Sequence, residues 1–187
     1  MRTETEIIQA VADGDEQALA VLYKLYSEKI YNTALSYTKI AEDAEEITQD
    51  VFLKILKSIS KFKQESSLNT WVYRITVNTS LNYLKKKNRF KFLKTHIKTH
   101  QHIDFEHPGV LLENKEKAAI LYQVIDCLSK NQKTAFILSF IEELPRQEVA
   151  NIMETSLKAV ESLLQRAKQN MRTELEKIYP HRRKSKK

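Results

Sequence analysis

Residues 145–171 read PRQEVANIMETSLKAVESLLQRAKQNM, and this stretch decides the class of fold. The segment after Pro145 is short and amphipathic, and it predicts a helix. Proline fits at this start, because it is tolerated at the first position of a helix. The polar triplet 154–156 predicts a turn, and Ser156 is suited to cap the helix that follows over about 157–178. A short helix, a tight turn and a longer helix form the helix-turn-helix pattern, whose second helix can lie in the major groove of DNA.

The second helix of this motif has two contrasting faces. Its apolar side chains recur every three or four residues and predict a core face, made of Val160, Leu164, Ala167 and Met171. The opposite face carries side chains that can bond to base edges and phosphates, namely Lys158, Ser162, Gln165, Arg166 and Gln169. An ordinary amphipathic helix with a solvated polar face has the same spacing, so the spacing alone leaves both interpretations open.

The composition of the chain restricts its fold and its partners. Only 2 glycines and 3 prolines occur among 187 residues, and this scarcity of turn-forming residues predicts an all-α protein. The net charge is +7 with an isoelectric point near 9.3, which favours a polyanionic partner. The single cysteine, Cys127, excludes an internal disulfide and a cysteine-rich metal site. Its apolar neighbours predict a buried, unreactive thiol.

The N-terminus lacks the pattern of a secretory signal. Glu4 and Glu6 stand where a signal peptide carries positive charge. No apolar run approaches the ~20 residues that a helix needs to cross a bilayer. We therefore expect a cytoplasmic protein without membrane insertion.

Helical periodicity divides the chain into two parts. In the first part it predicts helices within 5–38, with a turn at Gly14, and further helices over about 42–60 and 69–87. The pattern fails from about residue 85, although the fourth helix could extend into this stretch, and it returns at 115 with helices over 115–128 and 131–142. The sequence thus predicts two small helical domains, at 1–90 and 115–178, joined by a basic, flexible linker at 91–114 and followed by a basic tail at 179–187.

The helix over about 42–60 has the features of an interaction surface. Acidic residues crowd its first half, at Glu42, Asp43, Glu45, Glu46 and Asp50. These charges complement the helix dipole, which is a sufficient structural reason for them. They cannot face phosphates, so a basic protein surface is the functional alternative. One apolar face of this helix consists of Ile47, Val51, Ile55 and Ile59. Phe52 and Leu56 add a second apolar stripe that is either buried or offered to a partner.

Two further clusters lie in and beside the linker. Lysines and arginines occupy 85–98 with Tyr83, Phe90 and Phe92 among them, a pattern that suits nucleic acid but is also typical of a solvated linker. His96 and His100 have the spacing of a metal pair on a helix, but solvated histidines are the simpler interpretation. The sequence carries no glycine-rich phosphate loop, nucleophile elbow or convergent carboxylate pair. We therefore expect a protein that is not an enzyme and holds no cofactor or metal.

Two long stretches resemble a known family. The run DAEEITQDVFLKILKSISKF at 43–62, with NTWVYRITVNTSLNYLKKK at 69–87, resembles region 2 of bacterial RNA polymerase sigma factors of the extracytoplasmic-function (ECF) class. The run LSKNQKTAFILSFIEELPRQEVANIMETSLKAVESLLQRAKQNMR at 128–172 resembles region 4 of the same class. The resemblance covers about 10–90 and 112–175, in order and with the expected linker between.

The resemblance implies a transcription initiation factor that binds core RNA polymerase, reads the −10 and −35 elements of promoter DNA and helps to open the strands. The family's contact with the β′ clamp helices maps onto Asp43, Glu46, Gln49 and Asp50. Contact with the −10 element maps onto Tyr73, Arg74, Asn78, Lys85, Lys86 and Lys87, with Asn78 at the pocket for a flipped-out base. The −35 element would contact Lys158, Ser162, Gln165, Arg166 and Gln169. The β flap and an anti-sigma factor are further partners that the resemblance implies.

The sequence departs from the family in region 4. A frequent TVKSRL becomes AVESLL, which places Glu161 and Leu163 at commonly basic positions and leaves their contacts with DNA open. Glu154 replaces the usual turn glycine and predicts a strained or altered turn. Three rival interpretations remain: a stand-alone helix-turn-helix regulator that binds a palindrome as a dimer, a sigma-like interaction module without DNA binding, and a helical nucleic-acid enzyme.

Overall fold

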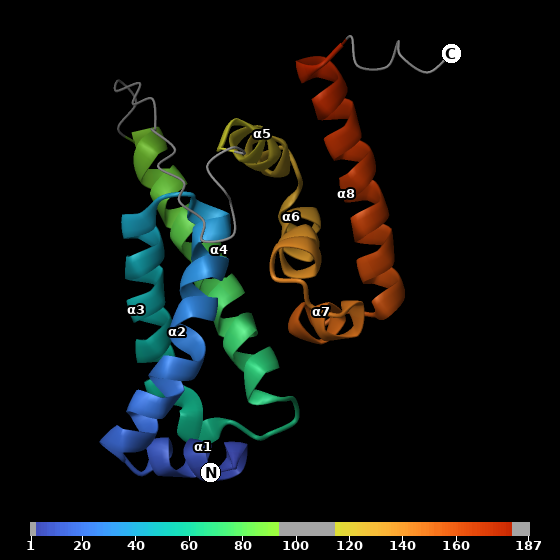
Figure 1. Ribbon diagram of the computed structural model, residues 1–187. Coiled ribbons are helices and arrows are strands. Elements are labelled where there is room, and N and C mark those ends of the chain that lie inside the picture. The colour runs from blue at the N-terminus through green and yellow to red at the C-terminus, as the bar shows by residue number, and fades with distance from the viewer. Residues whose placement is uncertain (1–2, 94–114, 181–187) are drawn as a thin grey trace. The chain divides into compact units, whose positions relative to one another are not determined.

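The computed structural model describes residues 3–93 and 115–180, and every regular element in these residues is a helix (Figure 1). The chain divides into two compact units, residues 1–107 and 108–187. The all-α class and the organisation into two helical domains are therefore confirmed. The first unit contains α1 (Glu4–Ala12), α2 (Glu16–Thr38), α3 (Ala41–Ser58), the short η1 (Ile59–Lys61) and α4 (Leu68–Leu93). The second contains α5 (Lys115–Asp126), α6 (Lys130–Phe136), the π-helical η3 (Ile137–Ile141), α7 (Arg146–Ile152) and α8 (Leu157–Ile178).

Side-chain caps fix the first two helices. Thr3 and Glu6 form a capping box at the start of α1, each side chain bonding to the other's backbone N–H. The carboxylate of Asp15 accepts hydrogen bonds from the backbone of Gln17 and Ala18 at 2.8 and 3.1 Å and so begins α2. Gly14, at a φ of 86°, makes the turn between them, as its position in the sequence predicts.

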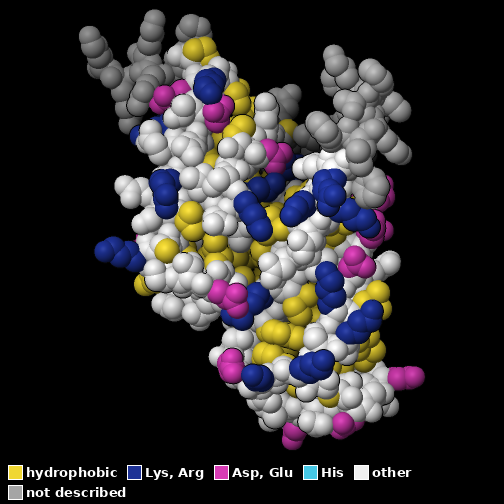
Figure 2. All heavy atoms as spheres, turned by 180° about the vertical axis from the view of Figure 1, so that it is seen from behind, with side chains coloured by type: hydrophobic (Ala, Val, Ile, Leu, Met, Phe, Trp, Pro, Cys, Tyr) yellow, Lys and Arg dark blue, Asp and Glu magenta, His cyan; other side chains and the backbone are white. Residues whose placement is uncertain are grey.

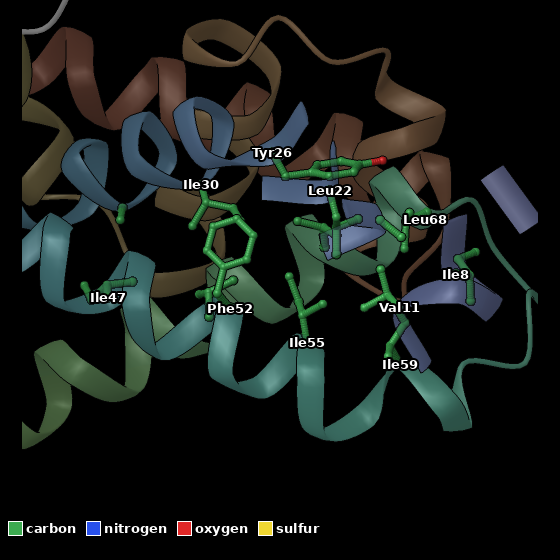
Figure 3. Close-up of a cluster of buried hydrophobic side chains, with 14 of the residues drawn as sticks. Ile8, Val11, Leu22, Tyr26, Ile30, Ile47, Phe52, Ile55, Ile59 and Leu68 are labelled. Atoms are coloured by element: carbon green, nitrogen blue, oxygen red, sulfur yellow. The ribbon is translucent and has the colours of Figure 1, made fainter. Parts of the chain in front are cut away.

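The core of the first unit is built by one face from each helix. Side chains from α1, α2, α3, η1 and the start of α4 point toward one another in Figure 3. The buried set includes Ile8, Val11, Leu22, Ile30, Ile47, Val51, Ile55, Ile59 and Leu68. The predicted apolar face is confirmed, because Ile47, Val51 and Ile55 of α3 and Ile59 of η1 are all buried. This packing fixes which face of α3 remains exposed.

The fourth helix is longer than the apolar pattern predicts, since α4 runs to Leu93 rather than to about Lys87. Lysine is a good helix former even where no apolar face directs it, so the basic turns can continue the helix. The remainder of the expected linker, including His96 and His100, lies outside the described residues, as does most of the basic tail.

The second unit corrects two predictions. The helix predicted over 131–142 is α6 followed by a π-helical turn, in which the N–H of Glu142 donates to the carbonyl of Ile137 at 3.0 Å. Cys127 is exposed rather than buried, and its thiol donates to the carbonyl of Gln123 at 3.6 Å. The inward positions around it are Val124, Ile125 and Leu128, and Cys127 falls between them on the outer side. An apolar neighbourhood in sequence did not define the face on which the thiol lies.

Candidate protein and nucleic-acid interfaces

An acidic surface lies on the exposed face of α3. Glu46, Gln49 and Asp50 are all exposed there, opposite the buried face of the same helix. Asp43 differs from these three, because it is buried at 8 % exposure. Among the side chains predicted to bind polymerase, the structure thus brings three to the surface and places the fourth inside.

A groove of about 460 Å³ runs between this surface and α2. It is lined by Tyr23, Ser27, Glu28, Tyr31, Glu45, Thr48 and Gln49. Burial, together with the negative charges of Glu45 and Glu42, raises the pKa of the Tyr31 phenol above its ordinary value. The groove is therefore acidic, and Tyr31 stays a neutral hydrogen-bonding group inside it.

Apolar side chains continue the surface along α3 and α2. Leu53 and Leu56 are 52 % and 41 % exposed, and the ring of Tyr23 packs on Phe52 with centroids 4.7 Å apart. Phe52 itself is buried, so the second apolar stripe is half core and half surface. The sequence pattern left this choice open, and it gave no sign of Tyr23, because the pairing of α2 with α3 is a tertiary relationship.

The polar end of α3 is joined to α4 by a cluster around Tyr83. The Tyr83 hydroxyl lies 2.8 Å from a carboxylate oxygen of Asp43 and 3.1 Å from one of Glu46. Lys87 forms an ion pair with the second oxygen of Asp43. Burial and these two carboxylates raise the pKa of Tyr83, which keeps the phenol protonated as a donor. The cluster ties the first turns of α3 to the basic part of α4.

The residues of α4 that were predicted to contact the −10 element fall into two groups. Asn78, Lys85 and Lys86 are exposed, and Arg74 is half-buried. Tyr73 is buried at 6 % exposure, and Lys87 is held by Asp43. Behind this face, the hydroxyls of Thr76, Thr79 and Ser80 donate to carbonyls one turn earlier in α4, and Lys54 of α3 reaches Thr79 at 2.9 Å. These hydroxyls therefore serve the helix and its packing.

The helix-turn-helix has the geometry that the sequence predicts. Ser156 caps α8 by accepting from the N–H of Ala159 at 3.2 Å. Val160, Leu164, Ala167 and Met171 are buried, whereas the five predicted DNA-contacting residues of α8 are exposed. Glu154 has a φ of 52°, in the left-handed region that a turn glycine would favour, so the expected strain in this turn is present.

Several polar side chains of α8 bond within the protein. The hydroxyl of Ser162 donates to the carbonyl of Lys158 at 2.9 Å, and Arg166 Nε donates to the carbonyl of Ser162 at 3.2 Å. On another side of the helix, Lys168 lies over the ring of Phe140 at 4.8 Å from its centroid. Glu161 faces Arg146, at the start of α7, with 3.7 Å between their charged atoms. This last pair links the two helices of the motif at their exposed edge.

Basic side chains are numerous on the side of the protein that Figure 2 shows. Lysine and arginine side chains are spread over this view, with hydrophobic side chains exposed among them. Within the described ranges 3–93 and 115–180, no group of three or more His, Cys, Asp or Glu side chains could hold a metal ion. No helix in the same ranges is long and apolar enough to cross a membrane.

Comparison with known families gives two matches in order along the chain. Residues 22–90 match Sigma-70 region 2, and residues 118–171 match Sigma-70 region 4. Together these matches contain α3, most of α2, α4 and α5, and the helix-turn-helix as far as Met171.

Characterised relatives are similar over nearly their whole length. The RNA polymerase sigma-H factor of Pseudomonas aeruginosa is 26% identical, over 89% of this chain and 90% of its own length. The ECF RNA polymerase sigma-E factor of Haemophilus influenzae is 27% identical, over 94% of this chain and 97% of its own. The sigma-E factor of Escherichia coli K12 is 27% identical over 89% and 91%.

Solved structures share the fold. CnrH, in complex with the cytosolic domain of CnrY, has a TM-score of 0.67 and 17% identity, covering 92% of this chain and 97% of CnrH. The sigma factor RpoE from Bartonella quintana, in complex with the anti-sigma factor NepR, has a TM-score of 0.67 and 18% identity, covering 84% and 96%.

Proposed function

This chain belongs to the ECF class of sigma-70 factors, non-enzymatic initiation factors that direct RNA polymerase to promoters, and on this premise we propose which of its surfaces meet polymerase and which meet DNA. The observation that carries the assignment is the separation of charge between exposed faces. The exposed face of α3 is acidic, whereas the exposed faces of α4 and α8 carry lysine, arginine and amide side chains. An acidic face is repelled by phosphates and suits a basic protein surface. In this proposal the region 2 domain spans 1–90 and the region 4 domain 115–178.

The acidic surface of α3 is the proposed docking site for the β′ clamp helices of the polymerase. Glu46, Gln49 and Asp50 would make the polar contacts, and the exposed Leu53 and Leu56 would add apolar contact on the same helix. Asp43 would act from inside, because its carboxylate already accepts from Tyr83 and pairs with Lys87. The region 4 domain would contact the β flap.

The exposed residues of α4 are proposed to bind the −10 element. Asn78 would bond to the edge of a base that has left the stack, while Lys85 and Lys86 would hold phosphates. Arg74 lies one turn before Asn78 and would support this contact. Tyr73 is buried, so its proposed part is to support the surface rather than to touch DNA.

The exposed face of α8 is proposed to read the −35 element in the major groove. Lys158, Ser162, Gln165, Arg166 and Gln169 present donors and acceptors there. Polymerase would hold the two domains at a fixed separation, so that two modest DNA contacts act together through a high effective concentration. The chain alone would then bind duplex DNA weakly, and the holoenzyme would bind specifically.

We further propose that this chain acts in the cytoplasm and that an anti-sigma factor controls it. CnrH and the Bartonella quintana RpoE were solved in complexes, with CnrY and with the anti-sigma factor NepR respectively. An inhibitor of this kind would gain most by covering the exposed apolar side chains of α2 and α3, since burying them supplies favourable free energy.

The test is a pull-down of core polymerase by the full chain, followed by transcription from a library of promoter fragments. Gln49→Ala with Asp50→Ala should reduce capture of core enzyme, because both side chains are exposed on α3 and neither is part of the core. Capture equal to wild type would refute the assignment of this face. Tight binding of a palindrome by the purified chain would favour a stand-alone regulator instead. Capture of core polymerase without specific transcription from any promoter fragment would favour the sigma-like interaction module without DNA binding.

A further inference from the structure

Glu161 interrupts a row of uncharged and basic side chains on the DNA-facing side of α8. Lys158, Glu161, Ser162 and Gln165 stand at helical positions i, i+3, i+4 and i+7, and all four are exposed. They therefore share one stripe of the helix surface. The side chain of Glu161 is 51 % exposed. A carboxylate in this stripe would meet DNA when the helix enters the major groove.

The structure supplies Glu161 with a cationic neighbour on the other helix of the motif. Arg146 Nη1 lies 3.7 Å from Glu161 Oε1, and both side chains are about half exposed. Arg146 begins α7, the helix that crosses the DNA backbone when a helix-turn-helix docks. The guanidinium has five donors, so it can face the carboxylate and a phosphate at once. It would thereby offset the repulsion between Glu161 and the DNA backbone.

We propose that Glu161 is a specificity-determining residue that selects cytosine at one position of the −35 element, an inference that rests on the proposed function of α8. An ionised carboxylate can only accept hydrogen bonds. In the major groove cytosine presents a single donor, its N4 amine, whereas guanine presents two acceptors. Thymine presents an acceptor and a methyl group, and adenine places an acceptor beside its donor. The carboxylate therefore attracts cytosine and repels the lone pairs of the other bases, which is selection by both contact and rejection.

Stability of the motif gives little reason for this carboxylate. Exposed ion pairs with charged atoms this far apart stabilise a fold little or not at all. The buried face of the motif, with Val149, Val160 and Leu164, packs without Glu161. Variants at Glu161 should therefore fold, and changes in their DNA selection report on recognition.

The experiment is selection of promoter DNA by holoenzyme, assembled from core polymerase and this chain, on a library with a randomised −35 element and a fixed −10 element. Wild type should enrich C at one position by about 5-fold or more over G. Glu161→Gln should move the preference at that position to A, because an amide pairs with the N6 and N7 of adenine. Glu161→Arg should move it to G, and Glu161→Ala should flatten it.

Two matched variants complete the test. Glu174→Gln removes the same charge from the same helix, 13 positions further along and about 20 Å away, and should leave the base preference unchanged. Arg146→Ala should weaken binding to all sequences and reduce the salt slope by about 1, while the preference for C remains.

Selection of a −35 sequence that is the same in wild type, Glu161→Gln and Glu161→Ala would overturn the inference and leave the proposed function standing. Selection of no −35 sequence at all by wild-type holoenzyme would overturn both. The preference for C could also disappear in Arg146→Ala as completely as in Glu161→Ala. That result would show that the Arg146–Glu161 pair selects the base, and it would overturn the assignment of selection to the Glu161 carboxylate alone.

Discussion

The hydroxyl of Tyr83 donates a hydrogen bond of 2.8 Å to the carboxylate of Asp43, which lies forty residues earlier in the chain. Lys87 pairs with the other oxygen of that carboxylate. One buried acid thus joins the helix proposed to bind polymerase to the helix proposed to bind the −10 element. Substitution of Tyr83 or Lys87 should therefore change the stability of the protein, unlike substitution of the exposed residues beside them.

Tyr83→Phe should destabilise the first unit by about 1–2 kcal/mol, because it leaves Asp43 and Glu46 close together without the shared donor. Denaturation in urea, followed by circular dichroism, measures the change. Tyr23→Phe is the control, since it also removes a tyrosine hydroxyl, but from an exposed ring, and it should cost little. Equal stability of Tyr83→Phe and wild type would show that the Tyr83 hydroxyl contributes nothing to the contact between α3 and α4.

Two of the three successive lysines in α4 should act in DNA binding and the third in stability: Lys85 and Lys86 against Lys87. Lys85→Ala and Lys86→Ala should each lower the salt dependence of −10 DNA binding, since both side chains are exposed and can release counterions from phosphates. Lys87→Ala should instead lower thermal stability, because it leaves Asp43 without its cation. The salt dependence of DNA binding by the holoenzyme and the melting temperatures of the free variants distinguish the two roles. Three identical slopes would contradict the distinction.

The apolar part of the α3 surface should contribute to polymerase affinity but not to folding. Leu56→Ala should weaken binding to core polymerase by about 1–2 kcal/mol, because a leucine that becomes buried at an interface is transferred from water. Its melting temperature should stay near that of wild type. Ile55→Ala, one residue away and fully buried, should do the reverse and cost about 2–5 kcal/mol of stability. Fluorescence titration with core enzyme and thermal unfolding give the two numbers.

Arg166→Ala should weaken binding of the −35 duplex and reduce its salt dependence by about one counterion. In the free protein Arg166 Nε donates to the carbonyl of Ser162 in its own helix, at 3.2 Å, and the side chain is exposed. Its guanidinium can therefore reorient toward a phosphate. An unchanged salt slope in Arg166→Ala would assign this side chain to the helix rather than to DNA.

The stability of the second unit should rise between about pH 8 and pH 10. Burial lowers the pKa of Lys133 to about 8, although its Nζ lies 2.8 Å from Asp126. The ordinary pKa of lysine is about 10.4. Between these values the unfolded chain binds more protons than the folded one, so the free energy of unfolding increases with pH, by about 1–2 kcal/mol from pH 7.5 to 9.5. Thermal unfolding at several pH values should show this rise in wild type. It should be absent in Lys133→Met, and a rise of the same size there would assign it to other groups.

Local patterns in the sequence determined the helices, their caps and their inward faces. The face of α8 with Val160 and Leu164 follows from helical periodicity, and Ser156 caps because its hydroxyl reaches the backbone of the same turn. The resemblance to the sigma family rests on the same kind of local information, since its motifs are continuous runs. All of these relationships join residues within a few turns of one helix.

Only the tertiary structure decided which side chains meet across helices. Lys87 reads as one of three equivalent lysines until α3 places Asp43 beside it. Cys127 lies outside although Val124, Ile125 and Leu128 are buried. Glu161 gains its cation from Arg146 on another helix. The helical repeat fixes the direction of a side chain around its own axis, but the rotation and distance of the neighbouring helix come from packing of the whole core. Those two quantities determine whether a charge is exposed, paired or available to a partner.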